Sequence, residues 1–320
     1  MKVLVTGGTG FIGSSLVPQL EAEGHDVTSL IRYVAGRYDF YKNEKVIIAD
    51  LRDRDAVGLA VKKVNPEVII NLAAQSAVSY SFQNGPDVIE TNLLGTVALA
   101  EAARDCDLKL FVQASTSEVY GRIPPWTRFP ATEETPTGAT SPYAVSKIAA
   151  EEYLRVLNNS YNFPTLILRP FNTYGRALIN NNHFVVERAI TQALTEKKIS
   201  LHDPRPRRDF LFREDHVSAY LRVIDCVQNK QDLSGMILNI TSGHVYTIDE
   251  MAHKVAQQVS VLTGASIECE FSSVPDRPLD IPILHGDPTK AFDKIRWKPK
   301  YSFEKGLEKA VYEWHTVLNK

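Results

Sequence analysis

Short runs of hydrophobic residues alternate with longer segments of helical periodicity through the first half of the chain. The runs that predict buried strands cover residues 3–6, 27–31, 46–49, 68–71, 110–114 and 165–169. Between them, hydrophobic residues at helical spacing predict helices over residues 11–23, 53–64, 86–104 and 143–158. Strands that are hydrophobic on both sides and separated by helices are typical of a parallel sheet covered on both faces. We therefore expect an α/β fold with a doubly wound parallel sheet.

The regular alternation of predicted strands and helices ends after about residue 171. Segments rich in Pro, Asn and Arg interrupt it at residues 180–183 and 203–209, and helical periodicity returns at 248–261 and 303–318. The pattern predicts a first domain over residues 1–172 and a smaller C-terminal lobe over most of residues 173–320. Some segments of the lobe are expected to return to the first domain.

Composition narrows the classes of partner. The 320 residues carry 36 basic and 38 acidic side chains, a net charge of −2, so neither nucleic acid nor an anionic membrane surface is expected as a partner. No run approaches the roughly 18 uninterrupted hydrophobic residues of a membrane span, and the first residues lack the hydrophobic stretch of a signal peptide. The cysteines are far apart, without metal-ligand spacing, which is typical of reduced thiols. We expect a cytoplasmic protein without a metal site.

The first strand leads directly into a glycine-rich turn. Gly7, Gly10 and Gly13 fit the pattern G-x-x-G-x-x-G and stand between a strand and a helix. Glycine is needed here because the turn is tight, a pyrophosphate must approach the backbone, and the helix packs closely on the strand. The N-terminus of the helix then presents free N–H groups to the phosphates. This context predicts a Rossmann-type fold that binds a nicotinamide dinucleotide, with Phe11 and Ile12 in the same turn.

The residues after the second and third strands bear on the choice of cofactor. An acidic residue about 20 positions after the glycines would hold the ribose diol of NAD, but Arg32 stands at the end of the second strand. A guanidinium suits a 2′-phosphate, since it pairs with phosphate oxygens as a fork. Arg32 therefore favours NADP, with NAD as the alternative. Asp50 and Leu51, directly after the third strand, are predicted to contact the adenine.

Tyr143 and Lys147 form the motif Y-x-x-x-K in a predicted helix. Residues at i and i+4 share a helix face, so the lysine ammonium is expected beside the phenol. That charge favours the phenolate and lowers the tyrosine pKa, which makes the tyrosine usable as a general base. Ser115, at the end of the preceding strand, is expected to hydrogen-bond the same reacting oxygen.

These motifs together resemble the extended short-chain dehydrogenase/reductase family, and the resemblance covers nearly the whole chain. The matching segments are residues 7–13, Asn71-Leu72-Ala73-Ala74, Ser115, Tyr143-x-x-x-Lys147, residues 169–175, Arg208-Asp209-Phe210, Arg277-Pro278-x-Asp280 and residues 286–291. The resemblance implies NAD(P), a transient 4-keto sugar and a nucleotide-diphosphate handle on the substrate. It also implies cofactor contacts at Leu72, Ala73 and Ala74, besides Tyr143 and Lys147.

The stretch at residues 115–121, Ser-Thr-Ser-Glu-Val-Tyr-Gly, is similar to sugar-nucleotide 4,6-dehydratases, and above all to GDP-mannose 4,6-dehydratases. On this hypothesis Tyr143 removes the proton of the C4 hydroxyl while the cofactor takes the C4 hydride. Glu118 then takes the C5 proton, and the C6 hydroxyl leaves with help from Glu118 or Thr116. A carboxylate is needed because a serine cannot act as a base without a partner.

Other reactions of the same family stay open at this point. Residues 171–175 look more like nucleotide-sugar 4-epimerases of the UDP-glucose or UDP-glucuronate type and like decarboxylases. UDP-glucuronate decarboxylases also carry a Thr-Ser-Glu-Val-Tyr-Gly stretch, and a ketoreductase is a further alternative. A non-catalytic NADP sensor is more remote, because sensors on this fold typically lose the tyrosine or the lysine.

The resemblance also implies substrate contacts and an oligomeric state. Matched positions place Asn172, Arg208 and Arg277 on the substrate diphosphate, His183 near the nucleotide base, and Ser79 in the sugar pocket. The predicted helices near residues 91–104 and 143–158 carry more hydrophobic positions than one core face needs. Relatives pair these helices into a four-helix bundle, so we expect a homodimer. The first domain is thus expected to bind the cofactor, and the C-terminal lobe to bind the substrate.

Overall fold

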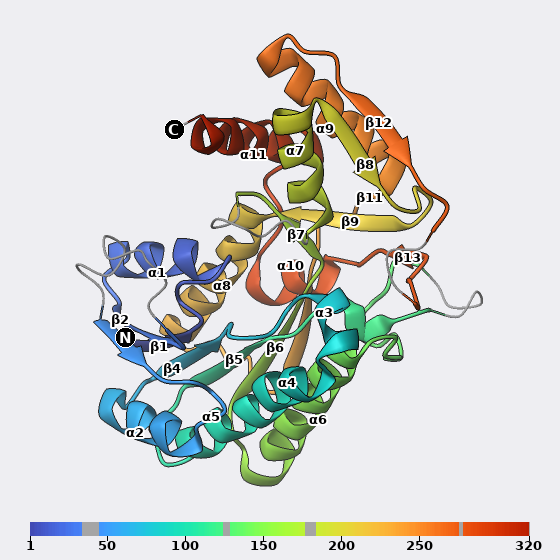
Figure 1. The fold of residues 1–320 in the computed structure, drawn as a ribbon. Helices are drawn as coiled ribbons and strands as arrows, with labels where there is room; N and C mark the ends of the chain where they lie inside the picture. Colours follow the sequence, from blue (N-terminus) through green and yellow to red (C-terminus); the bar gives the residue numbers. More distant parts are fainter. Residues whose placement is uncertain (34–44, 124–128, 177–183, 275–277, 320) are drawn as a thin grey trace.

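A seven-stranded parallel sheet forms the centre of the lower half of the molecule (Figure 1). The computed structural model describes residues 1–320 apart from 34–44, 124–128, 177–183, 275–277 and 320. The strand order is β10-β6-β5-β4-β1-β2-β3, and all neighbouring pairs are parallel. The strands are β1 (Lys2–Thr6), β2 (Asp26–Ile31), β3 (Lys45–Ile48), β4 (Val68–Asn71), β5 (Leu110–Ala114), β6 (Thr165–Pro170) and β10 (Met236–Ile240). The predicted doubly wound sheet is confirmed, and its order reverses between β1 and β4.

Both faces of this sheet are hydrophobic because successive side chains of a strand point to opposite sides. Val3 and Val5 of β1 belong to the core of one face, and Leu4 belongs to the core of the other. The first face is covered by α1 (Gly13–Ala22), α8 (Arg213–Gln228) and α10 (Thr289–Ile295), and the second by α2 (Arg54–Val64), α5 (Gly95–Ala103) and α6 (Pro142–Tyr161). Continuous hydrophobic strands are therefore the direct result of burial on both sides.

The helix predicted over residues 86–104 is interrupted by a π-helical turn. It consists of α4 (Gly85–Ile89), the π-turn η2 (Glu90–Leu94) and α5, and the short α3 (Val78–Gln83) precedes it. Thr91 and Asn92 of the π-turn are buried, and Asn92 bonds the loop that follows β4. Such turns occur often at functional sites. Here the turn joins the second helical layer to the carboxyl end of the sheet.

The C-terminal lobe stands above the central sheet in Figure 1 and has its own core. Aromatic side chains dominate that core, among them Tyr174, Phe210, Phe212 and Phe303. The lobe contains β7 (Asn172–Tyr174), α7 (Val185–Glu196), β8 (Lys198–Leu201), β9 (Arg207–Phe212), β11 (Val245–Thr247), α9 (Ile248–Thr263), β12 (Glu268–Phe271), β13 (Ile283–Leu284) and α11 (Phe303–Leu318). Its strands pair as β11-β9-β13, with β7 also beside β9, and as β12-β8.

Three later segments return to the central sheet. Helices α8 and α10 pack on the face that α1 also covers, and β10 extends the sheet beside β6. In the sequence these segments lie between elements of the lobe, so the chain passes repeatedly between the lobe and the central sheet. In the part of the chain that the structure describes, no helix is long and hydrophobic enough to cross a bilayer.

Candidate active site

The glycine turn brings the backbone between β1 and α1 against the loop after β4. Gly7 has a φ of +68°, and a Cβ there would stand 3.0 Å from the Ala73 backbone. A Cβ on Gly13 would overlap the carbonyl oxygen of Gly7. Helix α1 begins at this turn, and no side chain caps its N-terminus. Bare glycine backbone in the turn, at the positive end of the helix dipole, fits a pyrophosphate.

A buried amide fixes the loop after β4. Asn71 accepts a hydrogen bond from the Thr6 hydroxyl at 2.6 Å and donates to Gln113 at 2.8 Å and to Thr96 at 3.1 Å. The Ala73 N–H donates to Thr6 Oγ1 at 3.1 Å. These bonds join β1, β4, β5 and α5. The segment predicted to contact the cofactor is thereby held against the glycine turn.

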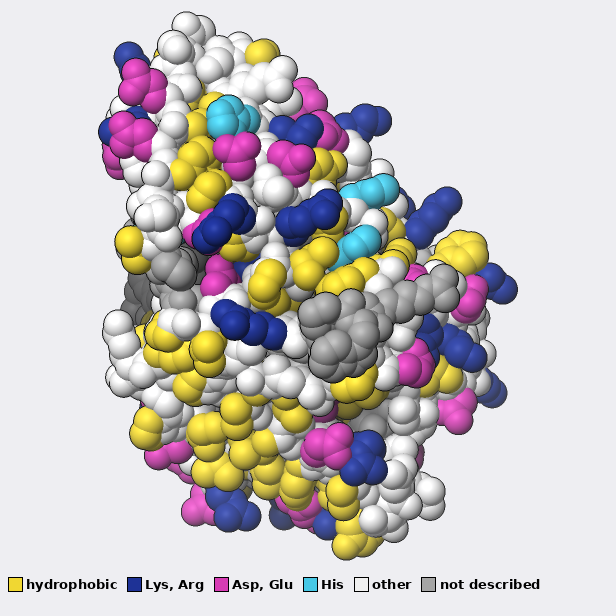
Figure 2. Space-filling model, turned by 90° about the vertical axis from the view of Figure 1, so that its right-hand side faces the viewer, with side chains coloured by type: hydrophobic (Ala, Val, Ile, Leu, Met, Phe, Trp, Pro, Cys, Tyr) yellow, Lys and Arg dark blue, Asp and Glu magenta, His cyan; other side chains and the backbone are white. Residues whose placement is uncertain are grey.

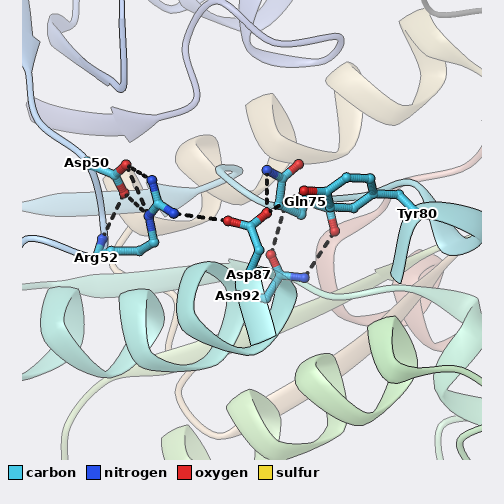
Figure 3. A network of polar contacts seen from close by, with 6 residues as sticks. All are labelled: Asp50, Arg52, Gln75, Tyr80, Asp87 and Asn92. Atoms are coloured by element: carbon cyan, nitrogen blue, oxygen red, sulfur yellow. Dashed lines mark hydrogen bonds and ion pairs between the residues drawn. The ribbon is translucent and has the colours of Figure 1, made fainter. Parts of the chain in front are cut away.

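Asp50 and Leu51, the predicted adenine contacts, follow β3. Arg52 grips the Asp50 carboxylate, with Nε 3.0 Å from Oδ1 and Nη2 2.6 Å from Oδ2 (Figure 3). The hydrogen bond from Arg52 holds the pKa of Asp50 below its ordinary value. Leu51 is buried in the core beside α5. The exposed Arg32 stacks its guanidinium 5.2 Å from the Tyr33 ring, at the end of β2.

Tyr143 and Lys147 lie one turn apart near the start of α6, and both side chains are buried. Lys147 Nζ donates to the Ala114 carbonyl at 2.8 Å, and burial lowers the pKa of Lys147 to about 8. Burial raises the pKa of Tyr143 above its ordinary value, and the charge of Glu118 adds to the rise. The prediction of a lowered tyrosine pKa is wrong for the protein alone. The phenol has lost its water, and the ammonium bonds a backbone carbonyl instead.

Thr116 and Glu118 lie beside this phenol. A hydrogen bond between the side chains of Thr116 and Tyr143 opposes the rise of the tyrosine pKa. Thr116 also caps the 3₁₀-turn η3 (Ser117–Tyr120), since its Oγ1 accepts from the Glu118 N–H at 3.2 Å. The Glu118 side chain is buried within that turn. The structure thus brings together a phenol, a hydroxyl and a carboxylate.

Ser115 points away from this group. Its hydroxyl donates to Glu151 of α6, which forms a buried ion pair with Arg169 at 2.6 Å. The expectation that Ser115 bonds the reacting oxygen is therefore corrected. The chain turns inward directly after β5, so that Ser115 faces the protein interior and Thr116 takes the position beside Tyr143.

The predicted substrate contacts are only partly described by the structure. Asn172 begins β7, and its buried Oδ1 has no hydrogen-bond partner among the described residues. Ser79 is exposed on the short helix α3. His183 and Arg277 lie outside the described residues. The substrate roles of these side chains stay predictions.

Arg208 is buried in β9 and has a fixed orientation. Its Nη2 is 2.8 Å from Asp280 Oδ1, and its Nη1 donates to the Ile281 carbonyl at 2.7 Å. Both partners belong to, or directly follow, the Arg277-Pro278-x-Asp280 motif. The two segments that the resemblance assigned to the substrate diphosphate are therefore in contact.

Two buried side chains of α8 were missed by the sequence analysis. His216 Nδ1 is 2.9 Å from Thr173 Oγ1, and burial lowers the pKa of His216 to about 3, so the ring is neutral. Its Nε2 and the Tyr220 hydroxyl have no hydrogen-bond partner in the described part of the chain. The charge of Tyr143 acts on Tyr220 and contributes to its raised pKa. Unpaired polar atoms near Tyr143 fit a bound polar ligand, and no sequence motif marks them.

These features define a class of protein. A glycine turn at the first strand–helix junction, a buried tyrosine–lysine pair at the carboxyl end of the sheet and a separate lobe are the parts of a dinucleotide-dependent Rossmann-type enzyme. Within the described residues, no group of His, Cys, Asp or Glu side chains could hold a metal ion. Residues 4–310 match the family model described as GDP-mannose 4,6 dehydratase. The chain belongs to this family of sugar-nucleotide enzymes within the extended short-chain dehydrogenase/reductases, which confirms the resemblance.

Individual relatives include both epimerases and dehydratases. The UDP-glucose 4-epimerase of Mycolicibacterium smegmatis is 32% identical, over 97% of each chain. The dTDP-glucose 4,6-dehydratase 1 of Escherichia coli is 30% identical, over 98% of this chain and 92% of that protein. The crystal structure of the Thermus thermophilus UDP-glucose 4-epimerase, a complex with NAD, superimposes with a TM-score of 0.86 at 32% identity and covers 99% of each chain. The preference for NADP that Arg32 suggested finds no support in these relatives.

Proposed function

We propose that this chain is a nucleotide-sugar 4,6-dehydratase that uses NAD and acts through a transient 4-keto sugar, with a GDP-mannose-type substrate favoured. The supporting observation is the buried Glu118 carboxylate beside Tyr143 and Thr116. A 4-epimerase only removes and returns hydrogen at C4, which the phenol and the cofactor can do. A dehydratase needs an additional base for the C5 proton, and Glu118 is an ionisable group in the right place.

Each residue of the site has a proposed role in the dehydration. When bound, NAD would supply the redox chemistry, oxidation at C4 and reduction at C6, and the positive charge of its ring would favour the Tyr143 phenolate. Tyr143 takes the C4 hydroxyl proton, and Thr116 hydrogen-bonds the same region. The new C4 ketone acidifies C5, so Glu118 takes the C5 proton. The C6–O bond breaks as the hydroxyl leaves with the proton from Glu118, as water. A solvent-derived proton then returns to C5.

NAD is the proposed cofactor for two reasons. The solved Thermus thermophilus relative holds NAD. Moreover, among the described residues that follow β3, Arg52 is engaged by the carboxylates of Asp50 and Asp87 and offers no free guanidinium to a 2′-phosphate. That leaves Arg32 as the described cation on which a 2′-phosphate would depend. The glycine turn and the uncapped end of α1 fit the pyrophosphate of either cofactor.

A 4-epimerase is the second proposal, because the Mycolicibacterium smegmatis UDP-glucose 4-epimerase matches the chain over nearly its full length. One experiment separates the two. The purified protein is incubated in D₂O with NAD and, in turn, GDP-mannose, dTDP-glucose, UDP-glucose, UDP-glucuronate and UDP-galactose. A dehydratase gives a product that has lost water and carries deuterium on carbon, because C5 is reprotonated from solvent. An epimerase gives an isomer without carbon-bound deuterium, and a decarboxylase releases CO₂.

We also propose the predicted homodimer through a four-helix bundle. Hydrophobic side chains of the η2–α5 and α6 segments are exposed, namely Leu94, Val145, Val156 and Tyr161. Figure 2 shows hydrophobic side chains gathered on the lower half of one face, which is the half of the molecule that contains the central sheet. Light scattering of the wild type should give twice the chain mass, and Val156→Asp should lower it. A monomeric wild type at micromolar concentrations contradicts the proposal. A cytoplasmic location stays a prediction.

A further inference from the structure

One carboxylate joins three segments at the side of the site that faces α3 (Figure 3). Asp87, in the first turn of α4, accepts hydrogen bonds from Arg52 Nη1 at 3.0 Å, Gln75 Nε2 at 3.0 Å and the Tyr80 hydroxyl at 3.1 Å. Arg52 follows β3, Gln75 follows β4, and Tyr80 belongs to α3. The Asp87 side chain is 22% exposed, so water competes only in part for these bonds.

Towards the adenine end, Arg52 is held between two carboxylates. It bonds Asp50 through Nε and Nη2, and Asp87 through Nη1. A guanidinium has a planar fork of donors, so two partners fix its orientation. Asp87 is therefore anchored to the segment that follows β3. This anchor does not depend on α3.

Towards the catalytic end, a separate anchor holds the start of α6. Asn92 of the π-turn accepts from the Gln75 N–H at 2.8 Å and donates to the Gln75 carbonyl at 3.1 Å. It also donates to Ser146 Oγ at 3.0 Å, and Ser146 donates to the Tyr143 carbonyl at 2.7 Å. Loss of Asp87 would leave these bonds intact. The backbone that carries the catalytic phenol should then stay in place.

Helix α3 is short and packs against α4 and α6, with Ser81 buried. It spans only Val78–Gln83, and its N-terminus has no side-chain cap. Helices this short are not stable without tertiary contacts, because nucleation is unfavourable. Tyr80 supplies such a contact through Asp87, and Ser79, the predicted sugar contact, is its neighbour.

We propose that Asp87 is a positioning residue for substrate binding, which holds α3 against the Arg52 segment so that this helix forms one wall of the sugar pocket. The inference rests on the proposed function. It concerns substrate affinity and leaves the chemical step to Tyr143, Thr116, Glu118 and Lys147. Nothing in the family motifs quoted above includes Asp87 or Tyr80.

The test is a split between KM and kcat. Asp87→Asn keeps the shape but replaces one acceptor by a donor that faces other donors, so KM for the sugar nucleotide should rise about tenfold. The turnover number should stay within about twofold. Tyr80→Phe removes one hydrogen bond, and KM should rise about threefold. The dissociation constant of NAD, followed by fluorescence, should change less than about threefold because Arg52 still pairs with Asp50.

Glu214→Gln is the matched control. Glu214 also accepts from a tyrosine hydroxyl, Tyr301 at 2.6 Å, and from a cation, Lys309 Nζ at 2.7 Å, but it belongs to α8 and pairs with α11. The Glu214→Gln variant should lower the melting temperature as Asp87→Asn does, and it should leave the KM for the sugar nucleotide unchanged. A loss of kcat at constant KM in Asp87→Asn, or an equal KM change in the control, overturns the inference.

Failure of the proposed function has a different signature. A wild type that converts none of the five sugar nucleotides refutes the proposed function, whatever Asp87→Asn does. Binding is therefore also measured by calorimetry in a Tyr143→Phe background, where no turnover is needed. There Asp87→Asn should weaken the binding of the sugar nucleotide about tenfold. Equal affinity with and without the substitution, or no binding at all, overturns the inference.

Discussion

The two ends of the predicted cofactor path differ in how their charges are controlled. At the catalytic end, Tyr143, Lys147 and Glu118 are buried, and loss of water is the largest cause of the shifted pKa values of Tyr143 and Lys147. At the adenine end, Asp50 and Arg52 are partly exposed, and a hydrogen bond is the largest cause of the lowered pKa of Asp50. Burial is thus the main cause of the pKa shifts at the catalytic end, and pairing with a charged partner is the main cause at the adenine end.

This difference in burial separates the groups proposed to transfer protons from the groups proposed to bind the adenine end of the cofactor. A charge that has lost its water responds strongly to any change of neighbour, which suits groups that gain and lose protons. A charge that stays partly in water is oriented by its partner but is screened, so single changes there have small effects. The effects of substitutions at the catalytic end should therefore be much larger than the effects of substitutions at the adenine end.

The largest effect is expected at the phenol. Tyr143→Phe removes the proposed acid–base group and keeps the ring, so kcat should fall by a factor on the order of 10³ while NAD still binds. Steady-state kinetics and NAD fluorescence titration measure both. Tyr153→Phe, on the same helix, removes a hydroxyl that bonds Glu101 instead and should leave kcat near the wild-type value. Equal losses in both variants would show that the effect is not local to the site.

The next largest effect is expected on stability, in a comparison of the adjacent carboxylates Glu151 and Glu152. Glu151 is 4% exposed and pairs with Arg169, which is equally buried, whereas Glu152 is 58% exposed and pairs with Arg155. Glu151→Gln leaves a buried guanidinium without its counter-charge and should lower the free energy of unfolding by about 3–5 kcal/mol. Glu152→Gln should lower it by less than about 1 kcal/mol. Urea denaturation measures both, and similar losses would contradict the role assigned to burial.

A smaller effect follows from Lys147 and depends on pH. Its pKa falls from the ordinary 10.5 to about 8 in the folded state, so between these values the unfolded chain binds more protons. The free energy of unfolding therefore rises with pH across this window, and the full penalty is present below about pH 8. Relative to Lys147→Met, the wild type should gain about 2 kcal/mol between pH 7.5 and pH 10. A constant difference between the two proteins would show that Lys147 keeps its ordinary pKa.

The sequence predicted the central sheet well because its strands are hydrophobic on both sides. It could also have revealed Glu151, since Tyr143, Lys147 and Glu151 follow one another at i, i+4 and i+8 on one helix face. It could not decide between Ser115 and Thr116, because a shift of one residue at a strand end reverses which side chain faces the pocket.

The sequence predicted that some later segments return to the first domain, but it did not show which ones. Strand β10 joins the central sheet from far along the chain, and the lobe strands β7, β11 and β13 are too short for periodicity to mark them. His216 and Tyr220 approach the site only because α8 packs back on the sheet. Asp87 likewise gains its role only from the folding together of the segments that it joins.

The smallest effect should come from Arg32, the exposed cation at the adenine end. Arg32→Ala should change the dissociation constant of NAD by less than about twofold, because NAD has no 2′-phosphate for a guanidinium to grip. If the side chain faces the 2′ position, NADP should bind about fivefold to tenfold more weakly at low salt, and the difference should shrink in 0.5 M NaCl. Parallel titrations of both cofactors measure this. Equal weakening of NAD and NADP binding, or a loss of NADP affinity that salt does not reduce, would show that Arg32 acts through the fold. The contrast between a buried catalytic end and a solvated adenine end would then be wrong for the adenine end.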